Sequence, residues 1–254
     1  MSSGNHELSG YCRRVRISEE SLEPASGGRI AHHTLNLPGQ SSCDSRQRGP
    51  TGCACYPHDV AQPDRTRRPA TYDDLLKVPD NLVAEILDGE LYASPRPAPR
   101  HADASTGLGG VLRNPFDRGR GGPGGWRILA EPELHLAADV VVPDLAGWTR
   151  ERLPALPDEA FFSLAPDWAC EVLSPSTAAM DRVKKLTIYA RERVAHVWLV
   201  DPIARTLEVL RLDAGRWTIV ATSSGLAVLH AEPFDAIELD LSLLWEEPEA
   251  HASR

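Results

Sequence analysis

Hydrophobic and polar residues show no sustained period before residue 70, and a regular succession of amphipathic segments begins near Thr71. Residues 1–69 are rich in Ser, Gly, Pro, Arg and His, a composition that buries too little apolar surface to offset the entropy of ordering. We therefore expect a disordered N-terminal extension over residues 1–69, a folded domain over 70–246 and a flexible tail over 247–254. A protein that starts near Arg68 would fit the same pattern.

Within the domain, short helices alternate with short apolar strands. Thr71 is a typical N-cap for a first helix, and Asp88-Gly89 between two apolar runs is a strong signal for a β-hairpin. Val183, Leu186 and Ala190 are spaced as the inner face of the last helix. The order of segments predicts an α/β (α+β) fold, with one mostly antiparallel mixed β-sheet flanked by helices. We expect helices at 71–77, 101–112 and 181–193, and strands at 82–87, 90–93, 127–130, 133–136, 140–142, 145–148, 168–173, 197–200, 207–212, 217–222 and 237–239.

Charge is unevenly distributed between these regions. The formal net charge is -9, of which residues 1–69 contribute +2 and residues 70–254 contribute -11. An acidic domain argues against a broad surface that coats nucleic acid, because neutralising phosphates needs clustered Lys and Arg. It still permits a small site that meets phosphate through metal ions. No apolar run of about 18 residues exists, so no membrane span or secretory signal is predicted, and a cytoplasmic location is expected.

Three acids stand inside or next to apolar strands. Glu171 lies within Trp168–Leu173, Glu85 lies within Leu82–Leu87, and Asp144 directly follows an apolar run that ends in Val-Pro. A buried carboxylate is unfavourable unless it is paired or binds a metal ion, so these positions suggest a site. A salt bridge or a solvent-facing edge would also explain Glu171, and a turn aspartate after proline would explain Asp144.

The helix after Glu171 adds a cation. Asp181, Lys185 and Tyr189 are spaced i, i+4 and i+8, so they share one helix face, whereas Lys184 is one position off it. The chain has only three lysines against 24 arginines. A lysine suits a role beside Glu171 because its ammonium is a compact donor whose pKa responds to burial. The alternative is a solvated face with a weak Asp–Lys pair.

Several short motifs occur in a specific order. They are Glu85-Ile-Leu-Asp-Gly-Glu90, Ser94-Pro95, His101, Val142-Pro-Asp144, Glu171-Val-Leu-Ser-Pro-Ser-Thr177, Asp181-x3-Lys185-x3-Tyr189 and Val197-Trp-Leu-Val-Asp-Pro202. Together they resemble the Uma-type restriction endonuclease family of bacteria, within the PD-(D/E)xK nuclease superfamily. The resemblance runs from Thr71 to Asp201, roughly half of the chain. The superfamily's usual Glu-x-Lys reads Glu171-Val-Leu173 here, so Lys185 on the helix is the substitute lysine.

The resemblance implies a restriction-endonuclease-like fold and a nuclease that hydrolyses phosphodiester bonds in DNA. The catalytic residues that it implies are Glu85, Asp144, Glu171 and Lys185. Mg²⁺ (or Mn²⁺) would be held by Asp144, Glu171 and the backbone carbonyl of Val172, because this ion prefers oxygen ligands. The ion would activate a water molecule, which Lys185 would orient.

Two further residues and one partner follow from the same resemblance. His101 is either a phosphate contact or a polar start of its helix, and Tyr189 is a second candidate substrate contact. A homodimer is compatible with a nuclease, since two cuts in a duplex need two sites.

A different function stays open, because fold does not fix function. The chain would then be a catalytically degenerate nuclease fold that acts as a nucleic-acid-binding or protein-interaction module.

Overall fold

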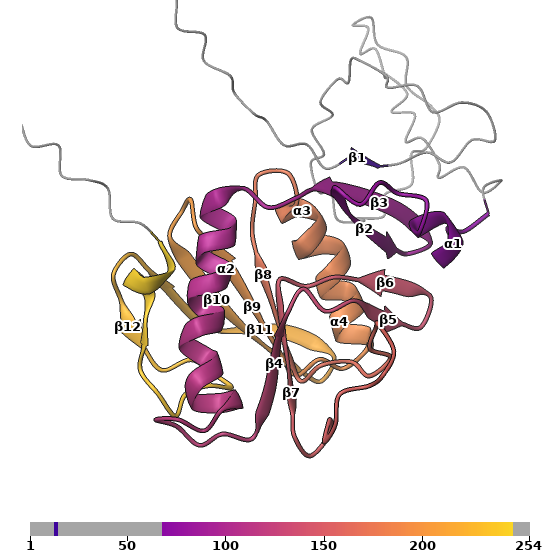
Figure 1. The fold of residues 1–254 in the computed structure, drawn as a ribbon. Coiled ribbons are helices and arrows are strands. Elements are labelled where there is room, and N and C mark those ends of the chain that lie inside the picture. Colours follow the sequence, from indigo (N-terminus) through magenta and orange to yellow (C-terminus); the bar gives the residue numbers. More distant parts are fainter. Residues whose placement is uncertain (1–12, 15–67, 246–254) are drawn as a thin grey trace, which may run out of the picture. The chain divides into compact units, whose positions relative to one another are not determined.

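The described part of the chain contains three β-sheets, whereas the sequence predicts a single sheet. The computed structural model describes residues 13–14 and 68–245 (Figure 1). The predicted N-terminal extension and C-terminal tail therefore lie almost wholly outside the described residues. Arg13–Arg14 are an exception, because they pair with residues 92–93 as a two-residue strand. Within these described ranges, no helix has the length and apolar character needed to cross a membrane.

The six-stranded sheet carries Asp144 and Glu171. Its strand order is β11-β10-β9-β8-β7-β4, and every neighbouring pair is antiparallel except β8 and β9. A parallel pair needs a crossover connection, and here the crossover contains the helical segment with Lys185. The strands are β4 (Trp126–Ala130), β7 (Leu145–Thr149), β8 (Trp168–Val172), β9 (His196–Asp201), β10 (Thr206–Asp213) and β11 (Arg216–Ser224).

The five-stranded sheet carries Glu85 and has the order β1-β3-β2-β6-β5. Asp88 and Gly89 connect β2 to β3 with φ values of 54° and 74°, the positive pair that a tight hairpin turn requires. The expected strand near residue 239 lies in a separate two-stranded sheet, so assigning it to the main sheet was wrong. The strands are β1 (Arg13–Arg14), β2 (Leu82–Leu87), β3 (Glu90–Pro95), β5 (Leu134–Leu136), β6 (Asp139–Val141), β12 (Val228–Leu229) and β13 (Leu239–Asp240).

Helices cover both faces of the six-stranded sheet (Figure 1). Trp168, Cys170 and Val172 of β8 share one core with the long helix α2, whereas Ala169 shares the opposite core with α4. Successive strand residues point to opposite faces, so Glu171 falls on the α4 face. The helices are α1 (Tyr72–Leu75), α2 (Pro99–Leu112), α3 (Ala178–Met180) and α4 (Leu186–Arg191), with π turns η1 (Arg113–Asp117) and η2 (Asp181–Lys185) and the 3-10 turn η3 (Leu241–Leu244).

The expected inner face of the last helix is partly wrong. Val183 is 67% exposed, and Leu186 and Ala190 are half-buried. The fully buried positions include Asp181 and Lys185, which lie in the π turn η2. Apolar periodicity misassigned this face because two of its buried positions, Asp181 and Lys185, hold charged residues beside the buried Ile188 and Tyr189.

Helix α2 is seated on the turn η3 near the end of the described chain. A Cβ atom on Gly107 would lie 2.6 Å from the carbonyl oxygen of Leu243, so only glycine permits this approach. Leu241 and Leu244 of η3 belong to the same core as Leu108 of α2. The position of α2, and of His101 in its first turn, therefore depends on this contact.

Candidate active site

Strand pairing brings Asp144 next to Glu171. Leu145, the first residue of β7, pairs with Cys170 of the antiparallel strand β8, so the residues on either side of that pair are also neighbours. The carboxylate Oδ2 of Asp144 accepts a hydrogen bond from the backbone N–H of Val172 at 2.6 Å. The Asp144 carboxylate is thereby fixed at the end of β8, beside Glu171.

Lys185 connects the two large sheets. Its Nζ lies 3.1 Å from Oε2 of Glu171 on β8 and 3.0 Å from Oε1 of Glu85 on β2. The same ammonium donates to the carbonyl oxygen of Val142 at 3.2 Å. The backbone N–H of Val142 in turn donates to Oε1 of Glu85 at 2.8 Å. One cation thus joins acids that are far apart in the sequence.

Tyr189 and Asp181 complete this buried cluster. The Tyr189 hydroxyl donates to Oε1 of Glu171 at 2.5 Å, so both oxygens of Glu171 are engaged by protein groups. Oδ1 of Asp181 lies 3.6 Å from Nζ of Lys185. The sequence reasoning did not include Asp181 in the site, although its i, i+4 spacing from Lys185 was the available signal. That pair is buried rather than solvated.

The electrostatics of the cluster follow from three carboxylates sharing one ammonium. The side chains of Glu85, Glu171, Asp181 and Lys185 are each no more than 6% exposed. Burial raises the pKa of Glu171 well above its usual range, against the opposing effect of Lys185. Burial also raises the pKa of Asp181 to about 6, again opposed by Lys185. The cluster therefore favours retaining a proton among its acids.

The Lys185 ammonium and the Tyr189 hydroxyl both stay protonated. Burial alone would lower the pKa of Lys185, but Glu171, Glu85 and Asp181 together raise it well above its usual value. Burial and the adjacent Glu171 raise the pKa of the Tyr189 hydroxyl. Lys185 is therefore a permanent cation and Tyr189 a permanent hydrogen-bond donor to Glu171.

His101 lies on the other side of Asp144. Its Nε2 is 3.3 Å from Oδ1 of Asp144, and its side chain is 12% exposed. Burial lowers the pKa of His101, whereas Asp144 and the Val172 backbone raise it, and the net pKa is raised. Its buried Nδ1 has no hydrogen-bond partner in the part of the chain that the structure describes. His101 therefore contacts one of the predicted metal ligands and leaves one ring nitrogen unused.

The predicted metal ligands fit a divalent cation by the chemistry of their donors. Two carboxylates and a backbone carbonyl are the hard oxygen ligands that Mg²⁺ and Mn²⁺ take. Among residues 13–14 and 68–245, however, no three His, Cys, Asp or Glu side chains stand in a ready metal-binding arrangement. Glu171 is held by Lys185 and Tyr189, and Asp144 by the Val172 amide. In this structure protein donors occupy the oxygens that a metal ion would need.

Comparison with known proteins identifies the family. The Uma2 family model, described as "Putative restriction endonuclease", matches residues 69–243. Curated proteins give no match. Among solved structures, the crystal structure of a putative nuclease belonging to DUF820 from Anabaena variabilis aligns with a TM-score of 0.56 and 23% identity, over 69% of this chain and 97% of that chain. This likeness confirms the predicted mixed α+β, nuclease-like fold. Since the family match covers more than half of the sequence, the chain belongs to the Uma2 family of restriction-endonuclease-like proteins.

Proposed function

We propose that this protein is a divalent-metal-dependent endonuclease that hydrolyses phosphodiester bonds in DNA. The observation that carries the proposal is the meeting of Lys185 with Glu85 and Glu171, beside Asp144 at the end of β8. A purely structural ion pair needs one acid for one cation. Three buried carboxyl groups around one ammonium are more than one cation neutralises, so the cluster favours holding a proton that a bound metal ion would replace.

Each residue has a role in this proposal. Asp144, Glu171 and the Val172 carbonyl would hold Mg²⁺ or Mn²⁺, and the bound ion would lower the pKa of a water molecule and neutralise charge on the phosphate. Lys185 keeps Glu85 and Glu171 together and supplies positive charge where the phosphate is attacked. Tyr189 is buried and its hydroxyl fixes the orientation of Glu171. It therefore acts as a positioning residue and presents no open surface to the substrate.

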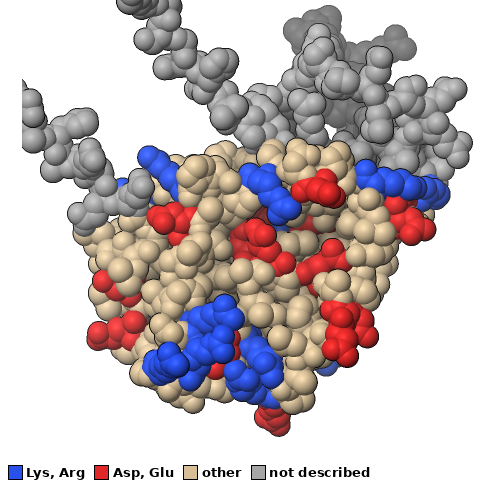
Figure 2. Space-filling view, viewed as in Figure 1, with Lys and Arg blue, Asp and Glu red and all other residues tan. Residues whose placement is uncertain are grey.

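The distribution of arginines supports a polyanionic substrate. Figure 2 shows one cluster of Lys and Arg side chains on the lower part of a face, with scattered acidic side chains around it and further basic side chains along the upper edge. Arg113 and Arg150 both bind Asp117, at 3.3 and 2.7 Å, and Arg118 and Arg120 next to it are exposed. Arg113 follows α2, about 18 Å along the helix axis from His101. Contacts to phosphates at this distance would hold a duplex without reading its sequence.

A plasmid-nicking assay tests the activity. Wild-type protein should nick supercoiled DNA with Mg²⁺ or Mn²⁺ and not with EDTA, whereas Asp144→Ala and Lys185→Ala should be inactive. Lys184→Ala is the matched control, because Lys184 directly precedes Lys185 on the same turn but binds the exposed Asp88 at 3.0 Å, outside the buried cluster. Lys184→Ala should keep activity. Equal nicking by all four proteins, with and without metal, would contradict the proposal.

Metal binding distinguishes a nuclease from a degenerate module. An ion that binds only the folded protein raises its melting temperature. Mn²⁺ should therefore stabilise wild-type protein and not Asp144→Ala. A protein that binds DNA in EDTA, cleaves nothing in either metal and gains no thermal stability from metal would be the degenerate nucleic-acid-binding module instead.

A further inference from the structure

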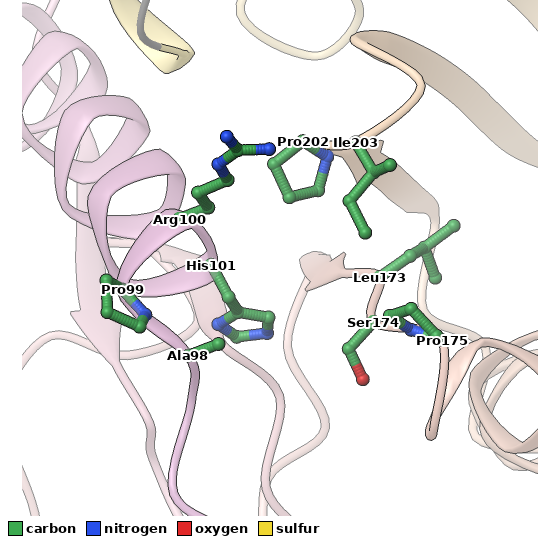
Figure 3. A pocket seen from close by; sticks show the side chains of 9 residues that line it. All are labelled: Ala98, Pro99, Arg100, His101, Leu173, Ser174, Pro175, Pro202 and Ile203. Atoms are coloured by element: carbon green, nitrogen blue, oxygen red, sulfur yellow. The ribbon is translucent and has the colours of Figure 1, made fainter. Parts of the chain in front are cut away.

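An apolar pocket opens directly beside the acids. It has a volume of about 430 Å³ and lies between the start of α2, the loop after β8 and the turn after β9 (Figure 3). Its lining residues are Ala98, Pro99, Arg100, His101, Leu173, Ser174, Pro175, Pro202 and Ile203. None of the catalytic roles described above uses this pocket, although His101 lines the pocket and also contacts Asp144.

The walls of the pocket suit an apolar ligand. Three prolines and two branched aliphatic side chains form most of the lining, and Ile203 is 60% exposed although it is large and apolar. The Ser174 hydroxyl is already hydrogen-bonded to the hydroxyls of Ser176 and Thr177, at 2.9 and 3.0 Å. The lining therefore offers no unused side-chain hydroxyl, and a ligand in the pocket would be held mainly by van der Waals contacts with the apolar side chains.

A cation and the acids flank this apolar surface. The Arg100 side chain extends along the mouth of the pocket toward Pro202 (Figure 3). On the inner side, the ring of His101 links the pocket to Asp144 at 3.3 Å. Leu173 follows Glu171 by only two residues. A ligand with an apolar ring in the pocket would thus have one negatively charged group near Arg100 and another near the candidate metal ligands.

We propose that this pocket holds the unpaired base of a nucleotide next to the bond that is cut. The inference rests on the proposed function and adds to it a preference for single-stranded or locally opened nucleic acid. Pockets for small ligands commonly measure roughly 300–1,000 Å³, so this one is large enough for a base. Apolar side chains can hold an unpaired base by contact with its face. A base inside a duplex stays stacked and paired, so it enters only after it has been flipped or unpaired.

Binding measurements in EDTA test this inference without cleavage. The probes are a fluorescein-labelled single-stranded DNA oligonucleotide, its duplex, and a series in which one abasic site is moved along the single strand. Wild-type protein should bind the single strand more tightly than the duplex, and one abasic position should weaken binding. Ile203→Ala should weaken single-strand binding by about tenfold, the effect of losing roughly two buried methylene groups. The same variant should no longer respond to that abasic site.

Ile219→Ala is the matched control, because Ile219 is also exposed, at 59%, but lies on β11 away from the pocket. It should behave as wild type with every probe. The pocket assignment would be overturned by equal affinity for every abasic position. It would also be overturned if Ile203→Ala weakened binding to the single strand and to the duplex equally. The two proposals fail separately. Metal-dependent nicking with a flat abasic series leaves the nuclease intact and removes the pocket, whereas an abasic effect without any nicking does the reverse.

Discussion

Replacing Asp181 by asparagine should make the metal-free protein more stable near neutral pH. Asp181 is a buried carboxylate, and Lys185, its one close cation among the described residues, is also shared with Glu85 and Glu171. Burial raises its pKa from 3.8 to about 6 despite Lys185, so its ionised form is disfavoured in the folded protein. Asparagine has nearly the same shape as the protonated acid and carries no charge.

The magnitude follows from the raised pKa. A rise from 3.8 to about 6 corresponds to about 3 kcal/mol, at about 1.4 kcal/mol for each pH unit. Between about pH 4 and pH 6 the folded protein binds more protons at Asp181 than the unfolded chain does. The free energy of unfolding therefore falls as pH rises through this window. Asp181→Asn should remove that fall, with a gain of up to about 3 kcal/mol at pH 7, or about 6–12 °C in melting temperature, and almost none at pH 4.

Urea denaturation in EDTA, followed at several values between about pH 4 and pH 7, measures this effect. Asp158→Asn is the matched control, because Asp158 is exposed in a loop and should leave the pH dependence unchanged. A loss of stability in Asp181→Asn at pH 7, or an unaltered pH dependence, would refute the reasoning. A stabilising substitution at a buried acid would also indicate that Asp181 is retained for function rather than for folding.

Four other substitutions test the cluster and the contact of α2 with η3. Lys185→Met should lower the free energy of unfolding by about 3–5 kcal/mol at pH 7, because it leaves buried acids without a cation, and the loss should shrink at lower pH. Tyr189→Phe should lower it by about 1–3 kcal/mol by removing the donor to Glu171, and no change would contradict the buried hydrogen bond. Gly107→Ala should destabilise by about 1–3 kcal/mol through its clash, whereas Gly110→Ala, with open space around it, should gain up to about 1 kcal/mol, both measured by thermal melting.

Features that depend on neighbours in the sequence could be predicted. Asp88-Gly89 forms the expected hairpin turn because its backbone requirement lies within the pair itself. The sequence singles out Glu171 because a carboxylate in an apolar strand needs a partner, and Lys185 and Tyr189 are its partners in the structure. The shared helix face of these two residues follows from their spacing. Their catalytic and substrate-binding roles stay predictions.

Features that depend on distant pairing could not be predicted. The five-stranded sheet forms partly because β2 pairs with β6 through Ile86 and Val140, and no local pattern specifies that choice. The buried position of Asp181 and the exposed position of Val183 reverse the usual relation between polarity and burial. That reversal becomes visible only when Glu85 and Glu171 lie beside the helix, because they are the partners of the buried Lys185.

The contact between Gly107 and Leu243 also bears on how the protein can be shortened. Helix α2 presents His101 in its first turn, and η3 packs against the middle of the same helix. A C-terminal deletion that removes η3, from Leu241 onward, would expose Leu108 and loosen the helix that holds His101 against Asp144. An inactive product of such a deletion would therefore report the loss of a support far along the chain, and the last turn should be kept in any minimal version of the domain.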